Sequence, residues 1–330
     1  MRKLFHRPAA MFAAALFSST FLTVAAPTAQ AQDNSFKPIR WIVPYPAGGG
    51  TDVVARAIGQ QMSTLTGHPV VIENKPGAAT AIGAQDVARS APDGATIISG
   101  DNGTYVFNPF LFSKLSYKVD ELAPIGLLAR FPLVLAVSPD TPYKTFADLA
   151  AAAKANPEAV KFASPGTGSP HHLAMEMLMS RSGLAAVHVP YRGMAPAVQD
   201  VLSGHVPVMV VDTVAGQTHF AAGKLRPLAV FSAKRLASLP DVPTFLELGQ
   251  SGVELYAWQG IAAAGKTPKP MLDKLSVALN EALKNAATRK PLEDMGVEIL
   301  GGTPEAMADY IKSETAIWGK LIQERGLKIE

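Results

Sequence analysis

The sequence predicts an α/β fold divided between two lobes, and three observations lead to this prediction. The chain has 330 residues, more than one ordinary domain contains. From Ile39 onward, short runs of β-branched residues alternate with helical patterns, the rhythm of βαβ units built on a parallel sheet. The last quarter of the chain is mostly helical, and we expect it to pack back onto the first lobe.

The predicted elements follow one another in a regular order. Strands are expected at 39–43, 70–73, 95–99, 133–137, 161–163, 187–189, 206–211 and 227–231. Helices are expected at 51–65, 79–89, 145–155, 170–183, 194–203 and 213–222. In the last quarter, apolar residues recur at helical spacing from Leu272 to Leu283 and from Met307 to Ile322, which predicts amphipathic helices with buried faces.

The chain is expected to cross between the lobes twice, near 131–134 and again near 257–259. The first lobe is therefore discontinuous. It is predicted to comprise residues 32–132 together with 257–330, and the second lobe residues 133–256.

The first 31 residues have the features of a secretory signal peptide. Arg2, Lys3 and Arg7 precede an apolar run over 9–26, and the A-x-A pattern at 29–31 predicts cleavage after Ala31. We therefore expect the mature protein in the periplasm. No later apolar stretch approaches the ~20 residues that a membrane-spanning helix needs.

Composition excludes several function classes. The chain has no cysteine, so no disulfide can form and no thiolate can act as a nucleophile or metal ligand. Without the three basic residues of the leader, basic and acidic side chains are equal in number. A neutral surface without a basic run argues against nucleic acid as a partner. The motifs H-E-x-x-H and G-x-S-x-G are absent, and no catalytic residue, metal or cofactor is predicted.

Glycine-containing turns between a strand and a helix recur along the chain. They lie at 46–52, 74–78, 164–169 and 191–196, two in each predicted lobe. Glycine lets the backbone turn sharply and lets an anion approach the amide groups, while the start of the following helix favours negative charge. A tight loop alone would also explain any one of them. Four such turns predict a cleft lined by helix N-termini that binds a small anion, with a carboxylate favoured.

Two further patterns suggest other chemistry, and their context argues against it. Residues 260–267 match G-x-x-x-x-G-K-[ST], but Pro268 and Pro270 follow and remove backbone donors that a phosphate would need. The adjacent His171 and His172 point to different sides of a helix, so they cannot jointly hold a metal from one face. His172 and Glu176 do share a face, which more often makes a packing contact than half a zinc site.

Several motifs, in chain order, carry a resemblance to a known family. They are PYPAGGGTD at 44–52, ENKPGA at 73–78, ASPGTGSPHHL at 163–173, VPYRG at 189–193 and Asp212. Together they resemble the Bug family, the extracytoplasmic solute-binding proteins of tripartite tricarboxylate transporters. The resemblance covers essentially the whole mature chain. It implies a two-lobed periplasmic-binding-protein fold of the Venus flytrap type (type II), with the ligand cleft between the lobes.

The resemblance also implies a function and a site. Such a protein captures an organic acid and delivers it to membrane permease subunits. The loops matching Ala47–Thr51 and Ser164–Ser169 clamp a ligand carboxylate through amides, hydroxyls and ordered waters. The predicted ligand-binding residues are Tyr45, Ala47, Gly48, Gly49, Gly50, Thr51, Asp52, Gly77, Thr80, Ser164, Gly166, Thr167, Gly168, Ser169, His171, Tyr191, Arg192 and Asp212.

One departure from the family pattern concerns the second turn. The family commonly has further glycine after Gly77 and Ala78, whereas here residues 79–81 are Ala, Thr and Ala. Methyl groups and a hydroxyl there are expected to reshape the far end of the ligand site.

The main prediction is thus a monomeric, non-catalytic binding protein for a carboxylate, such as a dicarboxylate, a tricarboxylate or an aromatic acid. Asp52 and Asp212 could orient a ligand or bound waters, or could cap a helix and end a strand. An exported enzyme using the same cleft, for example a hydrolase of acidic esters, is the alternative from another class. A nucleotide-hydrolysing protein is the third.

Overall fold

The computed structural model describes residues 37–156, 158 and 160–329. The predicted signal peptide and its cleavage site lie outside these residues. The strands are β1 (Ile39–Val43), β2 (Val70–Asn74), β3 (Thr96–Asp101), β4 (Leu122–Val137), β5 (Lys161–Ser164), β6 (Val187–Pro190), β7 (Val208–Asp212), β8 (Arg226–Val230), β9 (Tyr256–Ala264) and β10 (Glu298–Gly301).

The helices predicted from the sequence begin and end close to their predicted positions, whereas those at 108–111 and 286–294 were not predicted. They are α1 (Gly50–Thr66), α2 (Ala81–Ala88), α3 (Asn108–Leu111), α4 (Phe146–Ala155), α5 (Pro170–Ser182), α6 (Met194–Leu202), α7 (Thr213–Ala221), α8 (Lys269–Lys284), α9 (Ala286–Asp294) and α10 (Pro304–Glu324). A π-helical turn, η1 (Gly103–Phe107), precedes α3, and a 3₁₀ turn, η2 (Val119–Glu121), precedes β4. Among the described residues, no helix is both long enough and apolar enough to cross a membrane.

The strands form one mixed sheet in the order β2-β1-β3-β9-β4-β7-β5-β6, with β8 and β10 also paired to β4. The parallel pairing that the sequence predicts is found in part of the sheet only. Strands β1, β2 and β3 are parallel to one another, as are β5, β6 and β7, but every pair made by β4 or β9 is antiparallel. The parallel strands are those with a crossover helix between them, which is the connection that a parallel pair requires.

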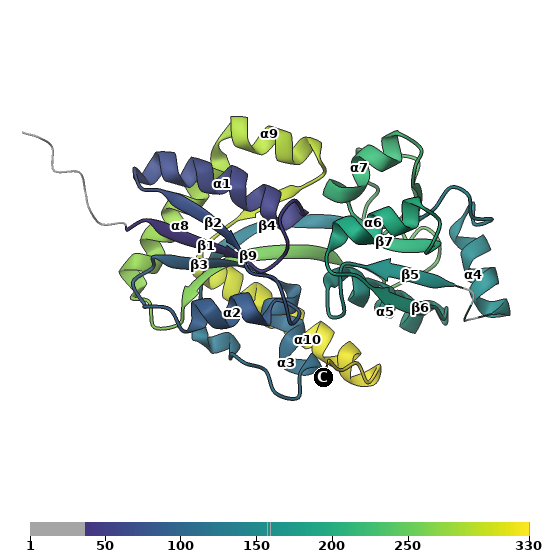
Figure 1. Ribbon diagram of the computed structural model, residues 1–330, viewed down its shortest axis with the longest axis horizontal. Helices are drawn as coiled ribbons and strands as arrows, with labels where there is room; N and C mark the ends of the chain where they lie inside the picture. Colours follow the sequence, from purple (N-terminus) through teal and green to yellow (C-terminus); the bar gives the residue numbers. More distant parts are fainter. Residues whose placement is uncertain (1–36, 157, 159, 330) are drawn as a thin grey trace, which may run out of the picture. The chain divides into compact units, whose positions relative to one another are not determined.

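Strands β4 and β9 run side by side through the middle of the sheet (Figure 1). From Leu122 to Pro132, β4 pairs with β9, and from Leu133 to Val137 it pairs with β7. The partner therefore changes at the point where the sequence predicts the first crossing.

Helices cover both faces of the sheet (Figure 1), with α1 and α9 on one side and α2 and α10 on the other at the end that contains β1. The predicted stripes are confirmed as core faces. In α8, Leu275, Leu279 and Leu283 are buried, and in α10 Met307, Trp318 and Ile322 are buried. These side chains belong to one large apolar cluster that fills the space between helices and sheet.

The phosphate-loop pattern at 260–267 lies mostly within a strand. Residues 260–264 belong to β9 and pair with β3 on one side and β4 on the other, while the Gly265 amide donates to the carbonyl oxygen of Glu121. These backbone donors already have partners, so the segment does not offer the free amides of a phosphate loop.

Candidate ligand-binding site

The N-terminal ends of α1, α5, α6 and α7 meet around one cavity of about 280 Å³, which we call the helix-end cavity. Its lining comes from three kinds of residue. Backbone-rich turns contribute Pro46–Thr51, Pro165, Pro170 and Arg192–Pro196; apolar side chains contribute Phe131, Val198, Ala215, Ala257 and Trp258; polar side chains contribute Tyr45, Asp101, His171, Gln199, Asp212, His219 and Gln259. Three of the predicted glycine turns therefore meet here, and the turn at 74–78 does not.

The first wall is the turn between β1 and α1. Gly48 has φ +85°, which a residue with a side chain rarely adopts, and nothing lies within 4 Å of where its Cβ would be. Its amide donates to Oδ2 of Asp52 at 2.9 Å. Asp52 is buried and does not line the cavity. Its hydrogen bond with Gly48 stabilises the turn from the side away from the cavity.

Other contacts fix the charge of Asp52. Burial raises the pKa of this carboxyl, but hydrogen bonds from Arg56, from the Gly48 amide and from Asn74 outweigh it and hold the pKa below its usual range. The carboxylate is therefore ionised and paired, and its charge does not repel an anion in front of the turn as a free carboxylate would.

The second wall is the turn before α6. Gly193 has φ +113° and donates its amide to the carbonyl oxygen of Pro165 at 3.1 Å. A Cβ on Gly193 would lie 3.2 Å from Cγ of Pro46, so the two walls approach each other closely. Arg192 is exposed, lines the cavity, and has no hydrogen bond or ion pair within the described residues. It is a guanidinium available to an anion.

Asp212 and His171 form the third side of the cavity, and both are buried. Asp212 caps α7 by accepting the Ala215 amide at 2.9 Å, and its Oδ2 lies 3.3 Å from Nε2 of His171. Burial raises the pKa of Asp212, yet the hydrogen bond and charge of His171 and the Ala215 amide bring it below its usual range. Nδ1 of His171 is buried and has no hydrogen-bond partner within the described residues.

Several lining residues were not predicted from the sequence. Asp101 ends β3 and accepts a hydrogen bond from the Tyr45 hydroxyl at 2.5 Å. Burial raises the pKa of the Asp101 carboxyl, although this hydrogen bond lowers it. Gln259 lies in β9 and donates to Oγ1 of Thr51 at 2.6 Å. Because Asp101 stands at the carboxyl end of a parallel strand, that position alone could have identified it. Gln259, Phe131 and Trp258 lie in strand segments that the sequence did not reveal.

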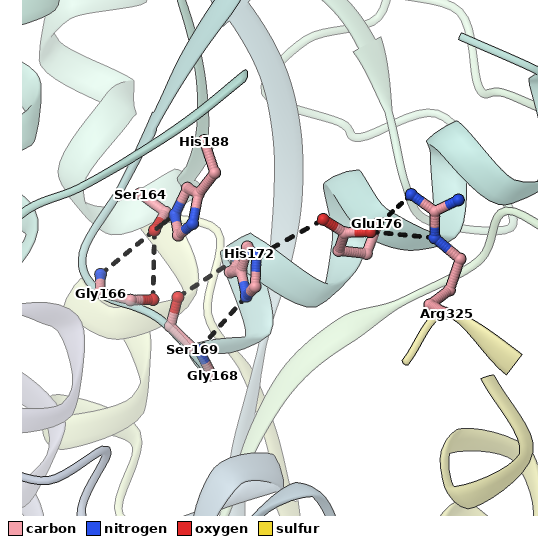
Figure 2. Close-up of polar contacts among 8 residues, drawn as sticks. All are labelled: Ser164, Gly166, Gly168, Ser169, His172, Glu176, His188 and Arg325. Atoms are coloured by element: carbon pink, nitrogen blue, oxygen red, sulfur yellow. Dashed lines mark hydrogen bonds and ion pairs between the residues drawn. The ribbon is translucent and has the colours of Figure 1, made fainter. Parts of the chain in front are cut away.

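The remaining predicted residues lie outside the cavity lining. Gly77 is exposed, and the buried hydroxyl of Thr80 accepts a hydrogen bond from that of Thr104. Thr167 is exposed, and Tyr191 donates its hydroxyl hydrogen to Asp200. Ser164, Gly166, Gly168 and Ser169 form the rear of the third turn, where Ser169 caps α5 by accepting the His172 amide at 3.2 Å (Figure 2). Their roles in ligand binding stay predictions.

A serine–histidine contact in this region bears on the hydrolase alternative. Oγ of Ser164 lies 2.7 Å from Nε2 of His188. Ser164 is fully buried and does not line the helix-end cavity, and burial next to His172 lowers the pKa of His188 to about 3. A base of that pKa takes up protons poorly near neutral pH, and a substrate in the cavity does not reach this hydroxyl.

A second hollow of about 700 Å³ lies against the β4–β9 pair, between 232–238 and 289–299. Its arginines have partners: Arg130 pairs with Glu298, Arg235 with Glu247 and Arg289 with Glu293. Lys234 also lines this hollow and is exposed, so the two hollows differ in their helix N-termini rather than in the presence of a free cation.

Comparison with known proteins gives consistent matches. The family model described as "Tripartite tricarboxylate transporter family receptor" matches residues 54–327. The UPF0065 protein in the tcbD-tcbE intergenic region of Pseudomonas sp. (strain P51) is 37% identical over 290 residues, covering 87% of this chain and 86% of its own.

Solved structures are similar over nearly their whole length. The periplasmic binding protein BugD is 34% identical with a TM-score of 0.84, covering 89% of this chain and 99% of its own. A protein of R. palustris, Rpa4515, solved with adipate, is 31% identical with a TM-score of 0.85, covering 89% and 99%. This likeness confirms the predicted fold class, a two-lobed periplasmic-binding-protein fold.

Proposed function

The chain belongs to the family of tripartite tricarboxylate transporter receptors, and from this premise we propose that it captures a small organic carboxylate in the helix-end cavity. The acid would then pass to membrane permease subunits of a transporter. We further propose that the mature protein begins after Ala31, works as a monomer in the periplasm, and consists of a first lobe (32–132 with 257–330) and a second lobe (133–256). The change of partner along β4 at Leu133 supports this division.

The observation that carries the proposal is the convergence of helix N-termini and one unpaired guanidinium on an otherwise largely apolar cavity. A helix N-terminus stabilises an anion by about 0.3–1 kcal/mol in ordinary geometries. Micromolar affinity requires about 8 kcal/mol, so a single helix end is not sufficient. Hydrogen bonds to a charged group contribute ~1.5–3 kcal/mol each. Arg192 and the first-turn amides of the helices, which have no partner within their own helix, would supply several of them.

Support for a carboxylate also comes from the family. Rpa4515 was solved with adipate, a dicarboxylate, and its fold matches that of this chain closely. The apolar side chains Phe131 and Trp258 suit the carbon skeleton of such an acid, while the turns and Arg192 suit its charged ends.

A thermal-shift screen over organic acids tests the proposal. An acid present at about 100 times its Kd should raise the free energy of unfolding by about 2.7 kcal/mol. Arg192→Met should weaken binding of that acid by roughly 1.5–3 kcal/mol, because one charged hydrogen-bond donor is lost. Arg89→Met is the matched control, since Arg89 is exposed and lies outside the cavity lining. A protein stabilised by no acid, or equally weakened by both substitutions, would contradict the proposal.

A further inference from the structure

The turn at 164–171 has two sides with different chemistry. Pro165, Pro170 and His171 line the helix-end cavity. On the other side, Gly168 and His172 face away from it and contact residues distant in the sequence. Two adjacent histidines thus serve opposite sides of the turn, as their spacing predicted: His171 contacts Asp212, and His172 contacts Glu176.

Figure 2 shows a chain of polar contacts that leads away from the rear of this turn. The Gly168 amide donates to Nδ1 of His172 at 3.2 Å, so the other ring nitrogen, Nε2, carries the proton in the neutral ring. Nε2 lies 3.6 Å from Oε1 of Glu176. The second carboxylate oxygen of Glu176 accepts two hydrogen bonds from Arg325, at 3.1 Å from Nε and 2.9 Å from Nη2.

Glu176 needs these partners because it is buried, with 7% of its surface exposed. Burial raises the pKa of its carboxyl, but His172 and Arg325 outweigh burial and hold the pKa below its usual range. Removing Arg325 would leave a buried carboxylate without its guanidinium partner, which is costly. The position of Glu176, and of His172 on the same helix face, therefore depends on Arg325.

Arg325 comes from a different part of the fold. It follows α10, which packs on β4 and η1, whereas Glu176 lies in α5, which packs on β7. The residues after Arg325 continue beneath the same turn: the Ile329 amide donates to the carbonyl oxygen of Leu111 at 2.8 Å. A Cβ on Gly168 would lie 2.8 Å from Cδ1 of Ile329, so the C-terminal segment lies directly against the rear of the turn.

We propose that Glu176 and Arg325 are positioning residues for ligand binding, joined in a latch that holds the turn at 164–171 against the C-terminal segment. The latch keeps Pro165, Pro170 and His171 in place along the cavity. It also ties the second proposed lobe to the first. This inference rests on the proposed function.

Hydrogen exchange of the protein without any ligand tests the positioning directly. In Arg325→Met and Glu176→Gln, peptides covering 164–172 should exchange at least about tenfold faster, while peptides covering β1 and β3 keep their rates. Arg325→Lys keeps the charge and should restore part of the protection. Arg289→Met is the matched control, because it removes an arginine from an ion pair with Glu293 on the protein surface.

Binding of adipate and malate to the same variants tests the consequence. We expect affinity to fall by about tenfold or more, chiefly through faster dissociation. The double variant should bind no more weakly than the single variants, since the two residues act through one contact. If exchange at 164–172 is unchanged, or rises equally throughout the protein, the latch proposal is overturned. If the wild type binds neither acid, and no acid of the thermal-shift screen stabilises it, while the exchange result holds, the latch stands as a structural device and the proposed function fails instead.

Discussion

Asp52 lies behind the first wall of the cavity and acts on an anion only through the backbone. Its carboxylate accepts the Gly48 amide and two side-chain partners, Arg56 and Asn74. Because the folded-state pKa is lowered, the ionised form is favoured by folding. Stability from this group is therefore present above the unfolded pKa of about 3.9 and is lost as pH falls through the lower folded pKa.

This linkage predicts the behaviour of Asp52→Asn. At pH 7 the variant should lose about 1–3 kcal/mol of unfolding free energy, because Arg56 and the Gly48 amide lose a charged acceptor. The difference from wild type should shrink as the pH is lowered below about 3.9, where the wild-type carboxylate takes up a proton. Urea unfolding at a series of pH values measures it.

Asp294→Asn serves as the control, because Asp294 pairs with Lys290 on the exposed face of α9 and should cost less than ~1 kcal/mol. A constant difference between Asp52→Asn and wild type across the acid range would show that the effect is not electrostatic.

The sequence revealed candidate site residues only where a glycine turn marked them. Tyr45, the turn at 47–51, Arg192, His171 and Asp212 do lie together around one cavity. Gly77 and Thr80 belong to a turn of the same chemical type, but it lies outside the cavity lining. The residues of a turn are adjacent in the sequence, so their chemistry can be predicted locally. The pairing of distant strands determines which turns share a cavity, and in this chain β4 and β9 make that pairing.

At the scale of elements, helices and parallel strands were predicted well because each has a regular apolar pattern. The first part of β4 and the whole of β9 were missed. Pro124, Gly126 and Pro132 interrupt β4, and 260–264 is a run of glycine, isoleucine and alanines with weak strand propensity. Both strands are nevertheless formed because they are buried in the middle of the sheet, where pairing on both sides outweighs local preference.

The segment before α2 combines strain with a departure from the family pattern. Ala78, Ala79 and Thr80 have φ values of +45°, +46° and +76°, a region that favours glycine. The glycine that is expected in relatives at this turn would adopt these φ values without strain. Asn108 holds the strained segment by donating to the carbonyl oxygen of Ala79 at 2.7 Å.

Ala79→Gly should therefore stabilise the protein by up to about 1 kcal/mol, because the relief of strain exceeds the entropy that glycine adds to the unfolded chain. Ala88→Gly, the same substitution within α2, should instead cost about 1 kcal/mol. Denaturant unfolding of both variants gives the comparison. Destabilisation of equal size in both would mean that the φ values at 78–80 carry no strain.

At the scale of the whole molecule, the two walls of the cavity belong to opposite halves of the sheet. The wall at 46–51 follows β1, whereas Arg192 follows β6. An acid with a charged group at each end can contact both walls at once. It then binds the closed arrangement more tightly than an open one and shifts the population toward it.

Adipate and its monomethyl ester test this expectation. The ester should bind at least about tenfold more weakly, because one set of charged hydrogen bonds is lost. Small-angle scattering should also show less compaction with the ester than with the diacid. Equal affinity and equal compaction would indicate that a single carboxylate clamp performs the recognition.

The place of β9 in the sheet also governs how the chain can fold. This strand inserts between β3 and β4, although both precede it by more than a hundred residues in the sequence. During synthesis, β3 keeps an open edge until Tyr256–Ala264 has emerged, so the N-terminal part of the sheet cannot close early. Contacts so distant along the chain slow folding. A fragment ending before Tyr256 would expose an unpaired strand edge and tend to aggregate. The full chain stays unfolded for longer than a chain with local contacts would, and an unfolded chain can pass through a pore.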